Sequence, residues 1–198
     1  MIISVLSLKG GVGKTTCAMH LAAVIADDER DAVVLDADDR KSASRWAAQS
    51  EGLTFRVIDG NLDRIAKQAR ELVSAGATVV IDTPPNSQDV LTRTGTVAST
   101  ILVPVVPTGL DIDRMVPTLE ILRDVEAAKG SLDVALLLNR FVRGEQLSRE
   151  ALEALKEFPL LDAKIRDLRI YQKVFAQQPK YLMEYWSVWE EIKEGAGL

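Results

Sequence analysis

The sequence predicts an α/β fold in which a mostly parallel, twisted sheet carries helices on both faces and forms a single domain over residues 1–198. Three observations predict it. Short runs rich in Val, Ile and Leu alternate with longer stretches of helical periodicity. Those runs are apolar at nearly every position, which is typical of strands buried on both faces. At 198 residues, of which 47% are hydrophobic, the chain is long enough to bury a core without disulfides or metals.

Six apolar runs are the predicted strands, and most of them are followed directly by Asp, Asn or Pro. Strands that alternate with helices require crossover connections, and crossovers favour parallel pairing. Ligands of such sheets lie outside the carboxyl ends of the strands, so chemistry is expected where each run ends. The predicted strands are residues 2–6, 33–35, 55–58, 79–81, 101–106 and 134–138.

Four stretches between these runs are predicted helices. The first is rich in alanine, and the second places its apolar residues on one stripe. The predicted helices are residues 15–26, 62–73, 112–128 and 148–157. The C-terminal segment, residues 165–198, also has a helical pattern, and we expect it to pack on the edge of the sheet. No linker or change of composition indicates a domain boundary.

Composition excludes several classes of protein. Cys17 is the single cysteine and His20 the single histidine, which excludes an internal disulfide and disfavours a Cys or His metal site. These counts favour a reducing compartment, so a cytoplasmic protein is expected. No apolar run approaches the length that spans a bilayer. The net charge of −5 argues against a surface that binds nucleic acid everywhere, but it leaves room for a local basic patch.

The segment after the first predicted strand has the pattern of a phosphate-binding loop, and thus of a P-loop NTPase. It joins a strand to a helix and contains three glycines, whose backbone N–H groups can converge on phosphate. Lys14 would supply positive charge to the terminal phosphates, and the Thr15 hydroxyl would ligate Mg²⁺. Leu8 stands where the common pattern has its first glycine. The predicted nucleotide-binding residues are Gly10, Gly11, Val12, Gly13, Lys14, Thr15 and Thr16.

Residues 9–15 resemble the loop of the deviant Walker A ATPases of the ParA/MinD family, Lys-Gly-Gly-x-Gly-Lys-[Thr/Ser]. The resemblance implies ATP and Mg²⁺ as cofactors. It also implies that Lys9 reaches across a nucleotide-sandwich homodimer to the phosphates of the partner subunit. A lysine supplied by the partner would neutralise the two facing triphosphates only when the dimer closes. Lys9 and Lys14 are therefore expected to be catalytic.

Carboxylates follow two of the predicted strands. Residues 36–40 resemble the family's switch I motif, Asp-x-Asp-Pro-Gln, and the resemblance implies that Asp38 positions the attacking water. Asp39 and Arg40 replace the family's Pro and Gln, so slow hydrolysis without a partner is expected. Asp82 ends another strand in the manner of a Walker B carboxylate, and we expect it to support Mg²⁺, through water.

Two further strand ends have matches in the family. Asn139 lies where the family commonly uses an Asn to recognise a purine, and the absence of the GTPase Asn-Lys-x-Asp pattern favours adenine. A strand-capping role for Asn139 stays equally open. Residues 104–111 resemble the strand and loop before the family's dimer-facing helix, and an architectural role is expected for them.

The C-terminal segment combines a basic and an acidic stretch. Residues 163–180 carry five basic side chains against one acidic, and the resemblance to ParA implies nonspecific DNA binding by Arg166, Arg169 and Lys173. An ordinary solvated face is the alternative. The predicted last helix, residues 181–194, is acidic, which argues against the basic membrane-targeting helix of MinD relatives.

The sequence therefore predicts a small ParA-type partition ATPase. The resemblance implies an ATP-dependent homodimer, nonspecific DNA, a ParB-like centromere-binding partner, no membrane, and a cytoplasmic, nucleoid-associated location. Since the chain begins at the loop's strand, no helix-turn-helix domain is expected before it. Three alternatives stay open: a MinD-like, flagellar or protein-cargo positioning ATPase, a metabolic P-loop enzyme, and a nucleotide-binding scaffold that hydrolyses almost nothing.

Overall fold

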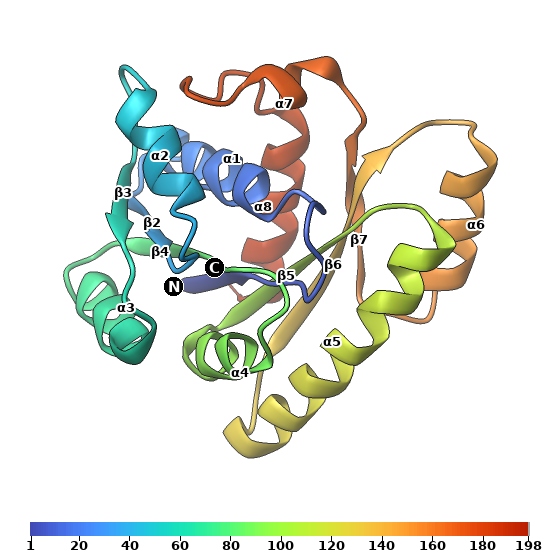
Figure 1. Ribbon diagram of the computed structural model, residues 1–198, viewed down its shortest axis with the longest axis horizontal. Helices are drawn as coiled ribbons and strands as arrows, with labels where there is room; N and C mark the ends of the chain where they lie inside the picture. The colour runs from blue at the N-terminus through green and yellow to red at the C-terminus, as the bar shows by residue number, and fades with distance from the viewer. Residues whose placement is uncertain (198) are drawn as a thin grey trace.

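A computed structural model describes residues 1–197 and contains one seven-stranded sheet. All neighbouring strands pair in parallel, in the order β3-β2-β4-β1-β5-β6-β7. The strand that leads into the glycine loop, β1, therefore lies at the centre (Figure 1). The strands are β1 (Ile2–Val5), β2 (Ala32–Asp36), β3 (Arg56–Asp59), β4 (Thr78–Asp82), β5 (Thr100–Val105), β6 (Asp133–Phe141) and β7 (Leu160–Arg166).

Helices cover both faces of the sheet. One face carries α1, α2, α7 and α8, and the other carries α3, α4, α5 and α6 (Figure 1). The helices are α1 (Lys14–Asp27), α2 (Ser42–Gln49), α3 (Ile65–Ser74), α4 (Gln88–Val97), α5 (Gly109–Lys129), α6 (Gln146–Leu155), α7 (Arg169–Lys173) and α8 (Met183–Gly195). A 3₁₀ turn, Leu62–Arg64, precedes α3.

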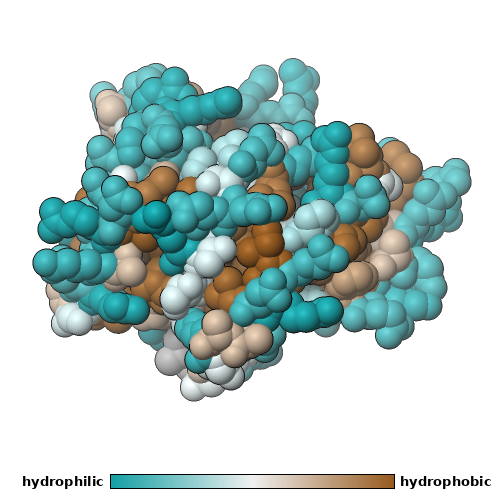
Figure 2. Space-filling model, turned by 60° about the horizontal axis from the view of Figure 1, so that its bottom comes forward, coloured by the Kyte–Doolittle hydropathy of each residue, from teal (hydrophilic) through white to brown (hydrophobic). Residues whose placement is uncertain are grey.

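Two apolar cores form because successive strand residues point to opposite faces. Val34 packs among the residues of α1 and α8, whereas the next residue, Leu35, packs among those of α3, α4 and α5. Both side chains are fully buried, and each such burial stabilises the fold by roughly 1.5–3 kcal/mol. The outer side of α4 and α5 is largely hydrophilic, with apolar residues between the polar ones (Figure 2).

The predicted fold class is confirmed, as are all six predicted strands and, within a few residues, the four predicted helices. Two further helices, α2 and α4, were not predicted. The eight residues of α2 are few for a periodicity to show, and α4 contains Gly95 and several β-branched residues that lower helix propensity.

The expectation of helical structure throughout residues 165–198 is wrong. The segment begins in β7, continues in the short α7 and reaches α8 only at Met183. As an edge strand with Asp162 and Lys164 in its middle, β7 is only half-buried and lacks the apolar run that marks the inner strands.

The last helix, α8, is part of the core. It packs against β7, as expected for the sheet edge, and also along α1, the helix that follows the glycine loop. Its inner face is fully or nearly fully buried: Tyr185, Val188, Trp189 and Ile192. Within residues 1–197, each helix is too short or too polar to cross a bilayer.

Candidate active site

The glycine loop, residues 8–13, joins the central strand to α1 and has the backbone that phosphate binding requires. Gly11 and Gly13 have φ angles of 79° and 95°, a left-handed region that favours glycine. Lys14 opens α1, and its ammonium donates hydrogen bonds to the carbonyls of Lys9 (2.9 Å) and Ser7 (3.3 Å). Burial lowers the pKa of Lys14, although Asp82 and Asp38 act in the opposite direction. The ammonium of Lys14 thus lies against its own loop, where its positive charge would meet an anion bound by the loop.

The Thr15 hydroxyl and the Asp82 carboxylate meet at the start of α1. Thr15 Oγ1 donates a hydrogen bond of 2.7 Å to Asp82 Oδ2, while Oδ1 of the same carboxylate is buried without a partner. Burial raises the pKa of Asp82 to about 7, and the bond from Thr15 offsets only part of this effect. A hydroxyl beside a buried carboxylate with an unpartnered oxygen is a donor set that suits Mg²⁺. The two predicted metal-site residues are therefore brought together.

Asp36, which ends β2, and Asp38, two residues beyond it, have different surroundings. Asp36 accepts hydrogen bonds from the backbone N–H and hydroxyl of Ser44, at 2.8 and 2.7 Å, and so holds the first turn of α2. Asp38 is 8% exposed and accepts from the backbone N–H of Arg40 at 2.9 Å. Its negative charge acts to raise the pKa of both Lys14 and Asp82.

The Lys9 side chain is held by a residue of α5. Its ammonium pairs with the carboxylate of Asp111, in the first turn of α5, and Asp111 also accepts a hydrogen bond from Thr108. The Asp111 side chain is 7% exposed and that of Lys9 25% exposed. Only an architectural role was expected for residues 104–111, so this contact was missed. The Thr-x-x-Asp spacing is a helix-capping signal that indicates where α5 begins but gives no indication of a partner.

Asn139 braces the glycine loop. Its amide Nδ2 donates to the carbonyl of Val12 at 2.7 Å, and its Oδ1 accepts from the backbone N–H of Arg140 at 3.0 Å. Arg140 has a φ of 60° and donates from Nη2 to the Gly11 carbonyl at 3.1 Å. A Cβ at position 13 would lie 2.4 Å from Nδ2 of Asn139, so this close approach requires glycine. Base recognition by Asn139 stays a prediction.

A cavity of about 460 Å³ opens beside the loop and α1. That volume is within the range of small-ligand sites. Aromatic rings of α2, of α7 and of the segment just after α7 form part of its wall, and the ring centroids of Trp46 and Phe175 lie 5.6 Å apart. The residues that line the cavity include Gly13, Thr16, Trp46, Asn139, Tyr171 and Phe175. The cavity has room for the base and ribose of a nucleotide whose phosphates occupy the loop.

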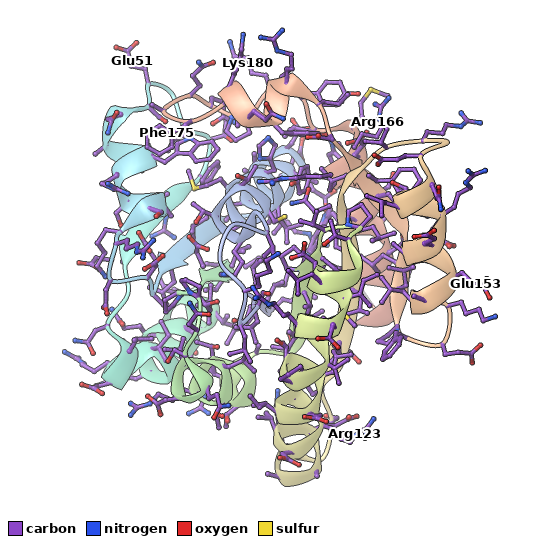
Figure 3. The ribbon with its side chains drawn as sticks, turned by 45° about the vertical axis from the view of Figure 1, so that its right-hand side comes forward. Glu51, Arg123, Glu153, Arg166, Phe175 and Lys180 are labelled. Atoms are coloured by element: carbon purple, nitrogen blue, oxygen red, sulfur yellow. The ribbon has the colours of Figure 1, made fainter. Side chains whose placement is uncertain are left out.

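The three predicted DNA-binding residues have different surroundings in the structure. Arg166 lines the cavity beside the loop, and its guanidinium pairs with Glu184 and donates to the Tyr181 hydroxyl at 2.7 Å. Arg169 and Lys173 are exposed on α7, at the end of the molecule where Arg166 and Lys180 also lie (Figure 3). Glu184, which follows the basic stretch in sequence, thus neutralises one of its charges.

The strand, glycine loop, helix, buried lysine and hydroxyl-carboxylate pair define a P-loop nucleotide-binding protein. A family model described as the CobQ/CobB/MinD/ParA nucleotide binding domain matches residues 3–178. The chain belongs to this family. The resemblance drawn from residues 9–15 is therefore confirmed.

Known proteins of several roles are similar to this chain. "Maintenance of carboxysome distribution protein A" of Gloeobacter kilaueensis is 33% identical over 176 residues, which are 87% of this chain and 79% of that protein. A putative plasmid partition protein of Borrelia burgdorferi, solved with AMPPNP, superposes with a TM-score of 0.75 at 17% identity, over 98% of each chain. The septum site-determining protein MinD of Pyrococcus horikoshii, solved with Mg-ADP, gives 0.78 at 16% identity, over 99% of this chain and 97% of its own. At these identities the two structures support the fold alone, and they confirm it.

Proposed function

We propose that this chain is a ParA-type ATPase that binds ATP and Mg²⁺, closes into a homodimer and drives DNA partition. The observation that carries the proposal is the position of Lys9. The ammonium of Lys14 bonds to carbonyls of its own loop, whereas the ammonium of Lys9, in the same motif, is held by Asp111 on α5. Released from Asp111, Lys9 is available to a phosphate outside its own subunit.

Each residue of the loop has a part in this proposal. The N–H groups of residues 10–15 and the ammonium of Lys14 hold the phosphates, while Thr15 and Asp82 hold the Mg²⁺ site. Bound Mg²⁺ would supply positive charge to the phosphate oxygens. Asp38 orients the attacking water by accepting its hydrogen bond. Asp39 and Arg40, both exposed, stand in place of the family's Pro and Gln, and slow hydrolysis without a partner is part of the proposal.

The DNA step of the proposal depends on the exposed cations of α7. Arg169 and Lys173 would contact the phosphate backbone without reading sequence, and a dimer would present the patch twice. Arg166 contributes less in this proposal because Glu184 already pairs with it. A ParB-like partner would stimulate hydrolysis and release the DNA, in a cytoplasmic, nucleoid-associated cycle without a membrane.

A protein-cargo positioning ATPase is the second candidate. The similarity to a carboxysome distribution protein favours it, since that relative is 33% identical to this chain. Both candidates share the ATP-dependent dimer and differ in cargo. Cosedimentation with duplex DNA, with anionic vesicles and with the product of the neighbouring gene separates them, because a partition ATPase is retained on DNA with ATP. Phosphate transfer to a metabolite by the monomer would instead identify a metabolic enzyme.

Replacing Lys9 with alanine tests the central step. We expect Lys9→Ala to bind the ATP analogue AMPPNP with Mg²⁺ but to stay monomeric, because its ammonium is absent from the partner's phosphates. Light scattering after gel filtration measures the mass with and without AMPPNP. The matched control is Lys67→Ala, which removes an exposed lysine of α3 that pairs with Glu71. Dimerisation of Lys9→Ala to the extent of the control would refute the proposal.

A further inference from the structure

A second cavity, of about 470 Å³, lies at the amino ends of β5, β6 and β7, and we call it the amino-edge cavity. These strands are parallel to β1, so this edge of the sheet is opposite to the one where the glycine loop follows β1. The volume is within the range of small-ligand sites. The lining includes Thr100, Glu126, Asp133, Leu161, Glu191 and Ile192.

Thr100, the first residue of β5, brings an unpaired hydroxyl to this cavity. The residue is 3% exposed, and its Oγ1 is buried without a hydrogen-bond partner among residues 1–197. Thr100 shares a face of the sheet with Leu102, which packs in the core beside α1 and α8. Asp133 pairs in register with Thr100 on the neighbouring strand, so the two side chains lie on that same face. A buried hydroxyl without a partner is costly, and a ligand in the cavity would supply the missing hydrogen bond.

Three carboxylates line the cavity and make it acidic: Glu126 of α5, Asp133 of β6 and Glu191 of α8. Within the described part of the chain, none of the three forms an ion pair, and the lining contains no basic residue. Burial lowers the pKa of Lys129, and the charge of Asp133 acts to raise it, but the Lys129 ammonium already donates to the Ala98 carbonyl. The cavity therefore favours a positively charged ligand.

Glu191 is fixed in position by the edge strand. Its two carboxylate oxygens accept hydrogen bonds from the backbone N–H groups of Asp162 at 2.7 Å and Ala163 at 2.6 Å, both in β7. Each carboxylate oxygen has a second lone pair, so Glu191 can still accept from a ligand. The half-buried Leu161 and the buried Ile192 add apolar walls.

These features together specify one ligand chemistry. Carboxylates only accept hydrogen bonds and an ammonium only donates them, so the lining requires a cation with N–H donors. The apolar walls suit an aliphatic chain, and carboxylates from two elements, β6 and α8, suit a charge at each end of that chain. We infer that the amino-edge cavity binds an aliphatic polyamine. One ammonium of the ligand lies between the Asp133 carboxylate and Thr100 Oγ1, which accepts its hydrogen bond, and the other meets Glu191.

The inference goes beyond ATP binding and partition and does not rest on either. The cavity lies at the other edge of the sheet from Lys14 and Asp82, so substitutions in one site leave the residues of the other in place. Dimerisation of Lys9→Ala would refute the proposed function without touching this inference. Absence of amine binding would refute this inference alone.

Titration calorimetry of the nucleotide-free full chain with putrescine and with cadaverine measures the binding. Nucleotide is left out because its phosphates would themselves bind the amine. The matched ligands are n-butylamine and n-pentylamine, which keep the aliphatic chain but lack one ammonium. We expect each monoamine to bind roughly 1.5- to 5-fold more weakly than its diamine, because one ion pair is lost. Equal affinity for the monoamines and the diamines would overturn the inference.

Three protein variants locate the site. Thr100→Val keeps the shape of the side chain and removes a hydroxyl that has no partner, so it should be at least as stable in urea yet bind the diamines roughly 2- to 13-fold more weakly. Asp133→Asn, at an exposed residue, should weaken binding roughly 1.5- to 5-fold. The matched control is Asp63→Asn, which removes a carboxylate of a different acidic cavity, where it pairs with Arg93, and should leave diamine binding unchanged.

Diamine affinity that is unchanged in both Thr100→Val and Asp133→Asn would overturn the inference, as would an equal loss in Asp63→Asn. Tighter binding of N-acetyl-lysinamide than of either diamine would also overturn it, because that order would assign the cavity to a lysine side chain of a partner protein.

Discussion

Asn139→Ala would remove the hydrogen bond that braces the glycine loop, from Nδ2 to the Val12 carbonyl, together with the local bond from the Arg140 N–H. Asn139 is 6% exposed, so water does not replace the bond to the loop freely. That bond is worth roughly 0.5–1.5 kcal/mol. If the brace holds the bound form of the loop, phosphate affinity falls by roughly 2- to 13-fold.

Titration calorimetry with AMPPNP, GMPPNP and inorganic tripolyphosphate measures where that loss falls. A brace acts on the phosphates, so all three ligands should weaken by the same factor and the preference for adenine should stay constant. Arg140→Ala is the control, because it removes one exposed bond to the Gly11 carbonyl and should cost less. Unchanged tripolyphosphate binding with a collapsed adenine preference would refute the brace and establish Asn139 as the base-reading residue.

Three further outcomes are expected. The pKa of Asp82 is raised from 3.8 to about 7 in the folded protein, so the nucleotide-free form should lose stability as the pH rises from about 4 to 7. The expected loss in the free energy of unfolding is roughly 1.4 kcal/mol per pKa unit. Urea denaturation of Asp82→Asn should not show this loss, and the variant should have no Mg²⁺-dependent hydrolysis. Asp111→Asn frees Lys9 before nucleotide binds, so analytical ultracentrifugation with AMPPNP should show roughly two- to tenfold tighter dimerisation. Trp189→Ala opens the core beneath α8 and should lower the free energy of unfolding by roughly 3–5 kcal/mol, against a smaller loss for the half-buried Trp186→Ala.

A specific result would contradict each of these three predictions. Stability of the unmodified protein that is constant or rising between pH 4 and 7 would show that Asp82 ionises at its ordinary pKa. Weaker dimerisation of Asp111→Asn would show that Asp111 supports the closed form rather than the open one. Equal losses at Trp189 and Trp186 would contradict the packing of α8 on α1.

The fold and the phosphate site could be predicted because local patterns encode them. The apolar runs that end in Asp36 and Asp82 lie in neighbouring parallel strands, in register, so their carboxylates meet at the same edge. The loop residues from Lys9 to Thr15 are contiguous, and their spacing alone fixes the strand, turn and helix.

Contacts between distant residues could not be predicted in the same way. Lys9 and Asp111 are 102 residues apart, and nothing local to either indicates the other. The pairing of Arg166 with Glu184 depends on how β7 and α8 pack, and β7 itself was missed because an edge strand tolerates polar residues. The brace from Asn139 to Val12 spans 127 residues and exists only once β6 lies beside the loop.

The place of Trp46 gives the molecule an intrinsic optical reporter. Its ring forms part of the cavity beside the loop, and its Nε1 is fixed by a bond of 2.8 Å to the Gln177 carbonyl. The other two tryptophans, Trp186 and Trp189, bond to Asp27 and Asp28 at the far end of α1, about 20 Å along that helix. Ultraviolet-excited emission from the unlabelled protein should therefore respond to nucleotide entry through one indole, with the remaining two as a steady background.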